Sequence, residues 1–100
     1  MNVPSSGWKN KDGTAARRCR CGSWKEHWIV VSGLNPPNDC SVLGCGNDAS
    51  LGAHVIHEEV RGEWIILSCD ACNQRSDVFQ LKDEVVLVTA TRRLSCGWGE

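Results

Sequence analysis

The fold and the metal chemistry of this chain depend on residues 40–75, which read CSVLGCGNDASLGAHVIHEEVRGEWIILSCDACNQR. Cysteines occur there in two pairs: Cys40 and Cys45, with four residues between them, and Cys69 and Cys72, with two residues between them. Each spacing lets a tight turn direct two thiolates at one tetrahedral ion, with Zn–S distances of about 2.3 Å. A single buried cysteine is common in a protein core. Burial alone does not explain four cysteines at the spacing of metal ligands. We therefore expect these cysteines to bind one structural Zn²⁺.

Between the cysteine pairs the sequence predicts a β-hairpin. Residues 53–58 (AHVIHE) and 63–67 (EWIIL) are two apolar stretches, with Gly62 in the turn between them. After the second strand, Asp70 can cap a helix of at most two turns. A glycine-rich knuckle, a hairpin and a helix N-terminus that meet at one ion form a treble clef. Since four thiolates leave no open coordination position, this metal holds the fold and is not a Lewis acid.

The flanking sequence adds further elements to the hairpin. Residues 24–31, WKEHWIVV, predict a strand or a short helical turn leading into one. Residues 32–40 form a connector, because Pro36 and Pro37 exclude a central strand. Residues 85–91, VVLVTAT, predict another strand. The expected fold class is small α+β, mainly β: a zinc-binding treble clef with extra strands.

Length and charge bear on domain organisation and partners. One hundred residues with 41% hydrophobic content predict one domain. Residues 1–16 are rich in Gly, Ser, Asn and Lys, so we expect a flexible basic N-terminal arm followed by a single zinc-binding domain at residues 17–100. Between Lys9 and Lys25, six Lys/Arg residues face one acid, Asp12. This basic segment either binds nucleic acid or an acidic partner, or is a solvated arm that keeps the protein soluble.

The sequence favours a cytoplasmic protein that does not enter a membrane. No apolar run approaches the 18 residues that span a bilayer, and the first residues, MNVPSSGWKNKDG, lack the apolar core of a secretion signal. The odd number of cysteines, seven, fits poorly with a fully disulfide-paired secreted scaffold. In a reducing compartment, thiols bind metal in preference to forming disulfides.

The stretch from Cys40 to Arg75, about a third of the chain, resembles the zinc-stapled HNH (His-Me finger) nucleases. In that family a histidine on the first strand activates water, and an Asp and a final His or Asn hold a catalytic divalent ion. The resemblance implies that His54 is the general base and Asn73 the second metal ligand. However, Ala53 stands where the family has its metal-binding Asp, and a methyl group cannot coordinate a cation.

The resemblance therefore implies a degenerate HNH-like member that binds nucleic acid or a protein partner without catalysis. Its Gly-Ala-His-Val element, residues 52–55, is similar to one in short bacterial and phage proteins. Two alternatives stay open. One is a metal-dependent HNH-type nuclease that uses His54, and the other is a phage or bacterial inhibitor or adaptor that acts on another protein.

Three further cysteines, Cys19, Cys21 and Cys96, lie outside the hairpin region. With His27 or His54 they would complete a second zinc site of three cysteines and one histidine. The alternatives are a disulfide between Cys96 and one of the other two, or free thiols, since a sequence gives no connectivity. A His54 that binds zinc there is not available as a general base.

Tryptophan is abundant for a chain of this length. We expect most of the five tryptophans to form the core around the metal: Trp8, Trp24, Trp28, Trp64 and Trp98. The alternative for Trp8 or Trp98 is stacking on a nucleic-acid base beside the basic segment.

Overall fold

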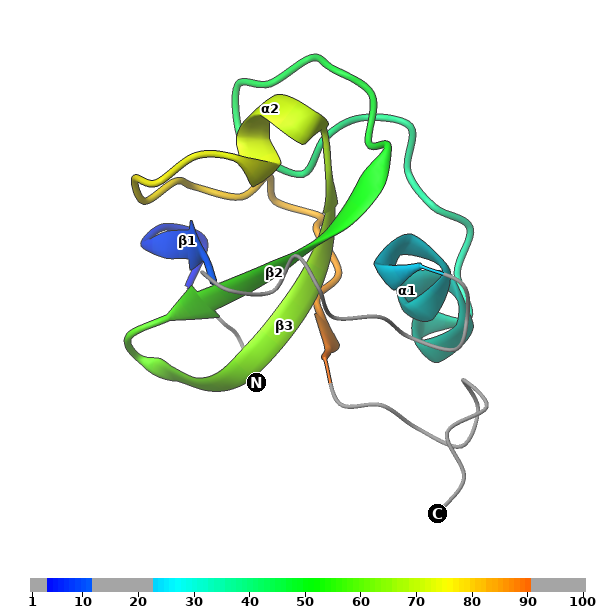
Figure 1. The fold of residues 1–100 in the computed structure, drawn as a ribbon, viewed down its shortest axis with the longest axis horizontal. Coiled ribbons are helices and arrows are strands. Elements are labelled where there is room, and N and C mark those ends of the chain that lie inside the picture. The colour runs from blue at the N-terminus through cyan, green and yellow to red at the C-terminus, as the bar shows by residue number, and fades with distance from the viewer. Residues whose placement is uncertain (1–3, 12–22, 91–100) are drawn as a thin grey trace.

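The computed structural model describes residues 4–11 and 23–90, and the predicted β-hairpin lies at its centre (Figure 1). Strand β2, Leu51–His57, pairs antiparallel with β3, Val60–Ser68. The turn consists of Glu58 and Glu59 alone. Gly62, expected in the turn, lies inside β3, where its φ of 94° requires a residue without a Cβ. The hairpin prediction is confirmed, and its turn is shorter than predicted.

Two short strands extend the hairpin to an antiparallel four-stranded sheet in the order β1-β2-β3-β4. Strand β1, Trp8–Asn10, pairs with β2. Strand β4, Val88–Thr89, pairs with β3 and is shorter than the seven residues predicted for it. The expectation of a flexible arm is wrong for residues 4–11, because Trp8 is fully buried. Base stacking by Trp8 is thereby excluded, whereas Trp98 lies outside the described residues.

Residues 24–31, whose sequence suits either a strand or a short helical turn, lie in helix α1, Trp24–Ser32. At its start, the Ser23 hydroxyl accepts the backbone N–H of Glu26 at 3.1 Å. At its end, Gly33 adopts a left-handed φ of 70° and donates its N–H to the Ile29 carbonyl at 2.9 Å. These two caps and the burial of Trp28 favour the helix over the strand that its β-branched residues would prefer.

The second helix, α2, comprises only Asp70–Asn73. Its N-cap is Cys69 and not Asp70, because the Cys69 sulfur accepts the backbone N–H of Cys72. Among the residues that the structure describes, no helix is long and apolar enough to cross a membrane.

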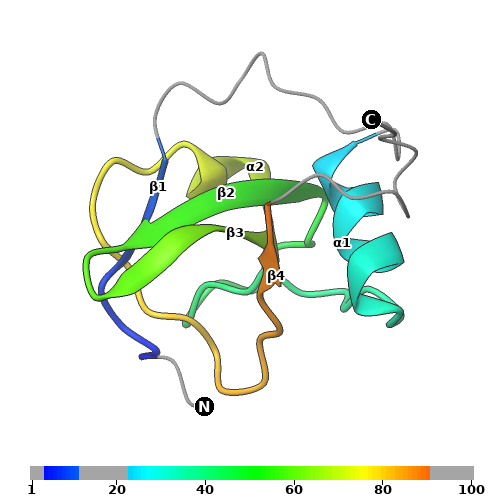
Figure 2. The same ribbon diagram turned by 90° about the horizontal axis from the view of Figure 1, so that it is seen from below.

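The two helices lie on opposite faces of the hairpin (Figures 1 and 2). Because side chains alternate between the two faces along β2, Ala53 and Val55 point into a core cluster that also contains Cys40, Cys69 and Cys72. Gly52 and His54 face α1 instead: a Cβ on Gly52 would lie 2.5 Å from the backbone of Trp24, and the rings of Trp24 and His54 are in contact. Thus α2 and the cysteines occupy one face of the sheet and α1 occupies the other.

Candidate metal centre

The four cysteines of the two sequence pairs come together at one point. Their sulfur atoms all lie within 4.8 Å of one another. Cys40, Cys69 and Cys72 are buried and Cys45 is half-buried, and none of the four forms a disulfide. The pairs are 24 residues or more apart in sequence, and the hairpin between them closes the loop. These four residues are therefore placed to hold a metal ion.

The separation of Cys45 and Cys69 matches one edge of a tetrahedral thiolate site. Their Sγ atoms are 3.7 Å apart. In a tetrahedron with metal–sulfur bonds of about 2.3 Å, the sulfur–sulfur edge is about 3.8 Å. A disulfide would need about 2.05 Å. The donor set of four soft thiolates in this geometry suits zinc or iron and not magnesium or calcium.

The first pair sits on a tight knuckle. The Cys40 N–H donates to the Asn47 carbonyl at 2.8 Å, and the Cys45 N–H donates to the Val42 carbonyl at 3.1 Å. Gly44 adopts a φ of 85°, which a residue with a Cβ rarely does. The glycine therefore lets the chain reverse within four residues, so that both thiols point to the same side.

The second pair straddles the end of β3 and the first turn of α2. The Cys69 sulfur accepts the Cys72 backbone N–H at 3.4 Å and the Asn47 side-chain amide at 3.7 Å. These donors, the backbone N–H first, lower the pKa of Cys69 to about 6. Burial raises the pKa of Cys72 to about 12 and also raises the pKa of Cys40. Metal binding must therefore displace protons from Cys40 and Cys72, while Cys69 is already a thiolate at neutral pH.

Two side chains that sequence reasoning missed fix the backbone of the centre. The Lys82 ammonium donates to the Cys45 carbonyl at 2.8 Å. The Asn10 side-chain amide donates to the carbonyls of Cys72 and Arg75, both at 2.9 Å. These partners are 37 and 62 residues from the cysteines they contact, and no spacing in the sequence signals such contacts.

The structure does not bring the residues of the HNH resemblance together. His54 is 4% exposed and packs edge-on against Trp24 of α1, with ring centroids 4.2 Å apart. Asn73 ends α2, whose Cys72 belongs to the core cluster on the opposite face of the sheet. A general base and a metal ligand of one nuclease site must reach the same phosphodiester. The hairpin separates His54 from Asn73.

His57 faces away from His54, as alternation along the strand predicts. Its ring packs against Trp8 at 5.1 Å. Its Nε2 lies 2.8 Å from the Ser6 carbonyl, and its Nδ1 accepts the Glu59 N–H at 2.9 Å. Nε2 therefore carries the hydrogen and donates a hydrogen bond to the Ser6 carbonyl, so both ring nitrogens have partners. This histidine serves the core and does not replace the missing acid.

The predicted second zinc site is not tested, because Cys19, Cys21 and Cys96 lie outside the described residues. Both histidines that were candidates for it contact the indole of Trp24: His27 at 5.0 Å and His54 at 4.2 Å. The Nε2 atom of His27 lies 2.8 Å from the Thr89 carbonyl. The ring of His27 is oriented by this bond.

The basic segment is described only in part, since Arg17, Arg18 and Arg20 lie outside the described residues. Lys9 is exposed on β1, whereas the Lys25 ammonium donates to the Ala49 carbonyl at 3.2 Å. The whole chain carries eleven Lys/Arg and twelve Asp/Glu, so its formal net charge is −1.

The centre has the chemistry of a closed site. Four protein sulfur atoms are as many ligands as a tetrahedral ion takes, so an ion bound by all four would have no position for water or substrate. Among the described residues, no other group of three or more cysteine, histidine or acidic side chains is placed to hold an ion. No family of known proteins, no curated protein and no solved structure matches this chain.

Proposed function

We propose that this protein is a zinc-stabilised binding domain, without catalysis at its metal, whose partner is another protein. The observation that carries the proposal is the cluster of four sulfur atoms, three of them buried, at the spacing of a tetrahedral thiolate shell. Zinc is the ion that most commonly occupies a four-thiolate site in a structural role. The metal holds the fold, and function lies on the surface that the fold presents.

The order of elements around the centre supports a treble clef. The knuckle with Cys40 and Cys45 precedes the β2–β3 hairpin, and Cys69 then caps α2. A one-turn helix such as α2 has little stability of its own, because the first turn fixes several residues for one hydrogen bond. Zinc coordination by Cys69 and Cys72 offsets this cost and orders the helix N-terminus.

The absence of catalysis is supported by the placement of the HNH-like residues. Ala53 offers no ligand, and His54 and Asn73 belong to opposite faces of the sheet. A degenerate HNH-like scaffold retains the zinc staple and the hairpin but has no assembled hydrolytic site. Its role is then binding, as an adaptor or inhibitor that acts on another protein.

A protein partner is favoured over nucleic acid by the near-neutral charge of the chain. Its eleven Lys/Arg and twelve Asp/Glu give a formal net charge of −1, which provides no overall attraction for a phosphate backbone. Arg75, the cation next to α2, is paired with Asp77 at 2.7 Å. Several large apolar side chains are also 40 to 58% exposed: Val30, Leu34, Leu43, Val78 and Val86. Exposed apolar side chains bury favourably against another protein.

Nucleic-acid binding through residues 9–25 is the second candidate. The observation in its favour is the run of six Lys/Arg against one acid, of which Lys9 is exposed at the edge of the sheet. This candidate predicts affinity for a DNA or RNA duplex that falls steeply with salt. A protein-binding domain predicts no such affinity at physiological salt.

Native mass measurement of the full chain, with and without a chelator, tests the metal proposal. We expect at least one Zn²⁺ per chain, lost on chelation together with the cooperative thermal transition. Two ions would place the second at Cys19, Cys21 and Cys96 with His27 or His54. A folded chain with no metal would overturn the proposal.

A second experiment separates binding from hydrolysis. Labelled DNA and RNA are incubated with the zinc-loaded protein in Mg²⁺, Mn²⁺ or Ni²⁺. We expect neither cleavage nor salt-dependent binding. Salt-dependent binding without cleavage would favour the second candidate, and cleavage that His54→Ala abolishes would establish the nuclease.

A further inference from the structure

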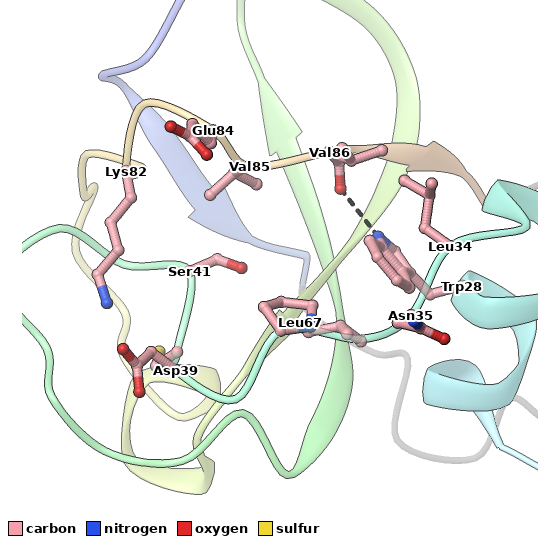
Figure 3. Close-up of a pocket in the computed structure, with 12 residues that line it drawn as sticks. Trp28, Leu34, Asn35, Asp39, Ser41, Leu67, Lys82, Glu84, Val85 and Val86 are labelled. Carbon is pink, nitrogen blue, oxygen red and sulfur yellow. Dashed lines mark hydrogen bonds between the residues drawn. The ribbon is translucent and has the colours of Figure 1, made fainter.

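A cavity of about 310 Å³ opens beside the metal centre (Figure 3). Three parts of the chain form its walls: the knuckle, the segment that leads into β4, and helix α1 together with the connector after it. Leu67 and Trp28 are buried residues of its wall, and Leu34 and Val86 form its rim at 48 and 40% exposure. Cavities that bind ligands begin at about 300 Å³. This one suits one or two amino-acid side chains and not a large cofactor.

Hydrogen bonds hold the walls of the cavity in place. The Trp28 indole N–H donates to the Val86 carbonyl at 2.8 Å, which ties α1 to the segment before β4. The Ser41 N–H donates to the Leu67 carbonyl, and the Lys82 N–H donates to the Ser41 carbonyl, both at 2.9 Å. Cys40, a ligand of the metal centre, also lines the cavity. The cavity is therefore preformed, and its shape depends on the knuckle.

The charged groups of the cavity lie at the end away from Trp28 and Leu34, whereas the polar Asn35 lies at the Trp28 end (Figure 3). The Ser41 hydroxyl points into the space, and the carboxylates of Asp39 and Glu84 lie on either side of Ser41. Lys82 is the one cation among the lining residues, and its ammonium donates to the Cys45 carbonyl at 2.8 Å without losing its charge. Asp39 and Glu84 against Lys82 leave the lining with one net negative charge, next to an apolar wall. The complementary ligand has an apolar body and a cationic group beside it.

We propose that this cavity binds a segment of a partner protein in which a bulky aliphatic or aromatic side chain is flanked by Lys or Arg. The apolar side chain packs between Trp28 and Leu67, and the flanking cation meets Asp39 and Glu84. This inference rests on the proposed function in one respect, that the partner is a protein. Attraction between these two carboxylates and the cations of such a segment increases the rate at which the segment associates.

Two short peptides matched in size and opposite in charge test the proposal. Acetyl-Lys-Leu-Lys-amide and acetyl-Glu-Leu-Glu-amide are titrated into ¹⁵N-labelled, zinc-loaded full-length protein. The reporter is the indole N–H signal of Trp28, identified by its loss in Trp28→Phe. We expect this signal and the amides of Ser41 and Val86 to shift in saturable fashion with the lysine peptide. Its affinity at low salt should exceed that of the glutamate peptide by about tenfold or more.

Two leucines with similar exposure provide a matched control. Leu34 lines the cavity and is 48% exposed, whereas Leu43 is 52% exposed and does not line it. Leu34→Ser should weaken binding of the lysine peptide several-fold, and Leu43→Ser should leave it unchanged. The double variant Asp39→Asn with Glu84→Gln should abolish the preference for the lysine peptide. Equal effects of the two leucine variants, or equal affinity for the two peptides, would overturn the proposal.

Zinc content measured on the same samples keeps the two proposals distinguishable. A zinc-loaded chain whose Trp28 signal responds to neither peptide would overturn the cavity proposal and leave the metal centre intact. A folded chain without zinc that still binds the lysine peptide would support the cavity and overturn the metal proposal.

Discussion

The two faces of the β2–β3 hairpin are built in different ways. One face carries four cysteines and the single turn of α2, with little regular structure around them. The other face is covered by the nine residues of α1, capped at both ends and packed through aromatic rings on His54 and Gly52. On the proposed function, an ion bound by the cysteines holds the short elements of the first face together. The second is stabilised by close packing, in which small changes of volume are costly.

The comparison also shows how one strand serves two purposes. Ala53 and His54 are neighbours in sequence, yet alternation places Ala53 against the metal side and His54 against α1. The HNH resemblance treats these two positions as parts of one site. In this sheet they belong to different cores.

Removal of one thiol from the metal face should have the largest effect. Cys72→Ser replaces a buried cysteine of the four-sulfur cluster. Structural zinc contributes about 10–16 kcal/mol to the folding of small domains, which is comparable to the whole free energy of unfolding of an ordinary domain. We expect loss of bound zinc by native mass measurement and loss of the cooperative thermal transition by circular dichroism. Ser50→Ala, at an exposed position, is the control. Full zinc content and an unchanged Tm in Cys72→Ser would contradict the role given to this face.

A methyl group added on the other face should destabilise the protein without releasing zinc. In Gly52→Ala the new Cβ would lie 2.5 Å from the backbone of Trp24, so α1 must shift, at a cost of about 1–3 kcal/mol or more. The checks are chemical denaturation and the zinc count. Gly46→Ala is the matched control, since nothing lies within 4 Å of its added Cβ. Comparable losses in both variants would mean that close packing does not govern this face.

Loss of the Asn47 side-chain amide, which contacts the Cys69 sulfur, should weaken zinc binding without unfolding the zinc-loaded protein. Asn47→Ala removes the donor 3.7 Å from the Cys69 sulfur, and lost contacts of this kind typically reduce metal affinity by about 10–100-fold. Competition with a chromophoric chelator measures the change. Asn38→Ala, an exposed asparagine in the connector, should have no effect. An affinity equal to that of the unmodified protein would show that Asn47 does not support the thiolate.

The smallest effect is expected from the surface pair beside α2. The Arg75 guanidinium lowers the pKa of Asp77 to about 2, so the pair is ionised at any pH at which the thiolates bind metal. Both side chains are solvated, at 35 and 62% exposure, and such pairs contribute little. Asp77→Asn should lower the urea midpoint slightly at pH 7, and the difference should vanish in 1 M salt. A large or salt-independent loss would assign the pair a structural role.

Local pattern was sufficient to predict the parts of the fold that depend on nearby residues. The cysteine spacing, the hairpin and the proline connector each follow from a few adjacent residues, and the structure confirms them. The conformation of residues 24–31 was not predictable in this way, because apolar β-branched residues suit both helix and strand. The caps at Ser23 and Gly33, together with the packing of Trp28, decide it.

The strand at Trp8–Asn10 had no signal in its own sequence. Its hydrogen bonds go to β2 and to Phe79, and the Asn10 amide reaches the end of α2, 62 residues away. Such contacts exist only once the hairpin and the knuckle have formed. A polar, glycine-containing segment therefore predicts flexibility, although residues 4–11 of it are folded.

By itself, the sequence determined which atoms can hold an ion, because thiol identity and spacing are local properties of the chain. It also determined the hairpin that joins the two cysteine pairs. Only the tertiary structure decided which side of the sheet each residue faces: Ala53 toward the cysteine cluster, His54 toward α1, Trp8 into the core. The reason is that facing depends on strand register and on helices packed from elsewhere in the chain, and no short stretch of sequence contains either.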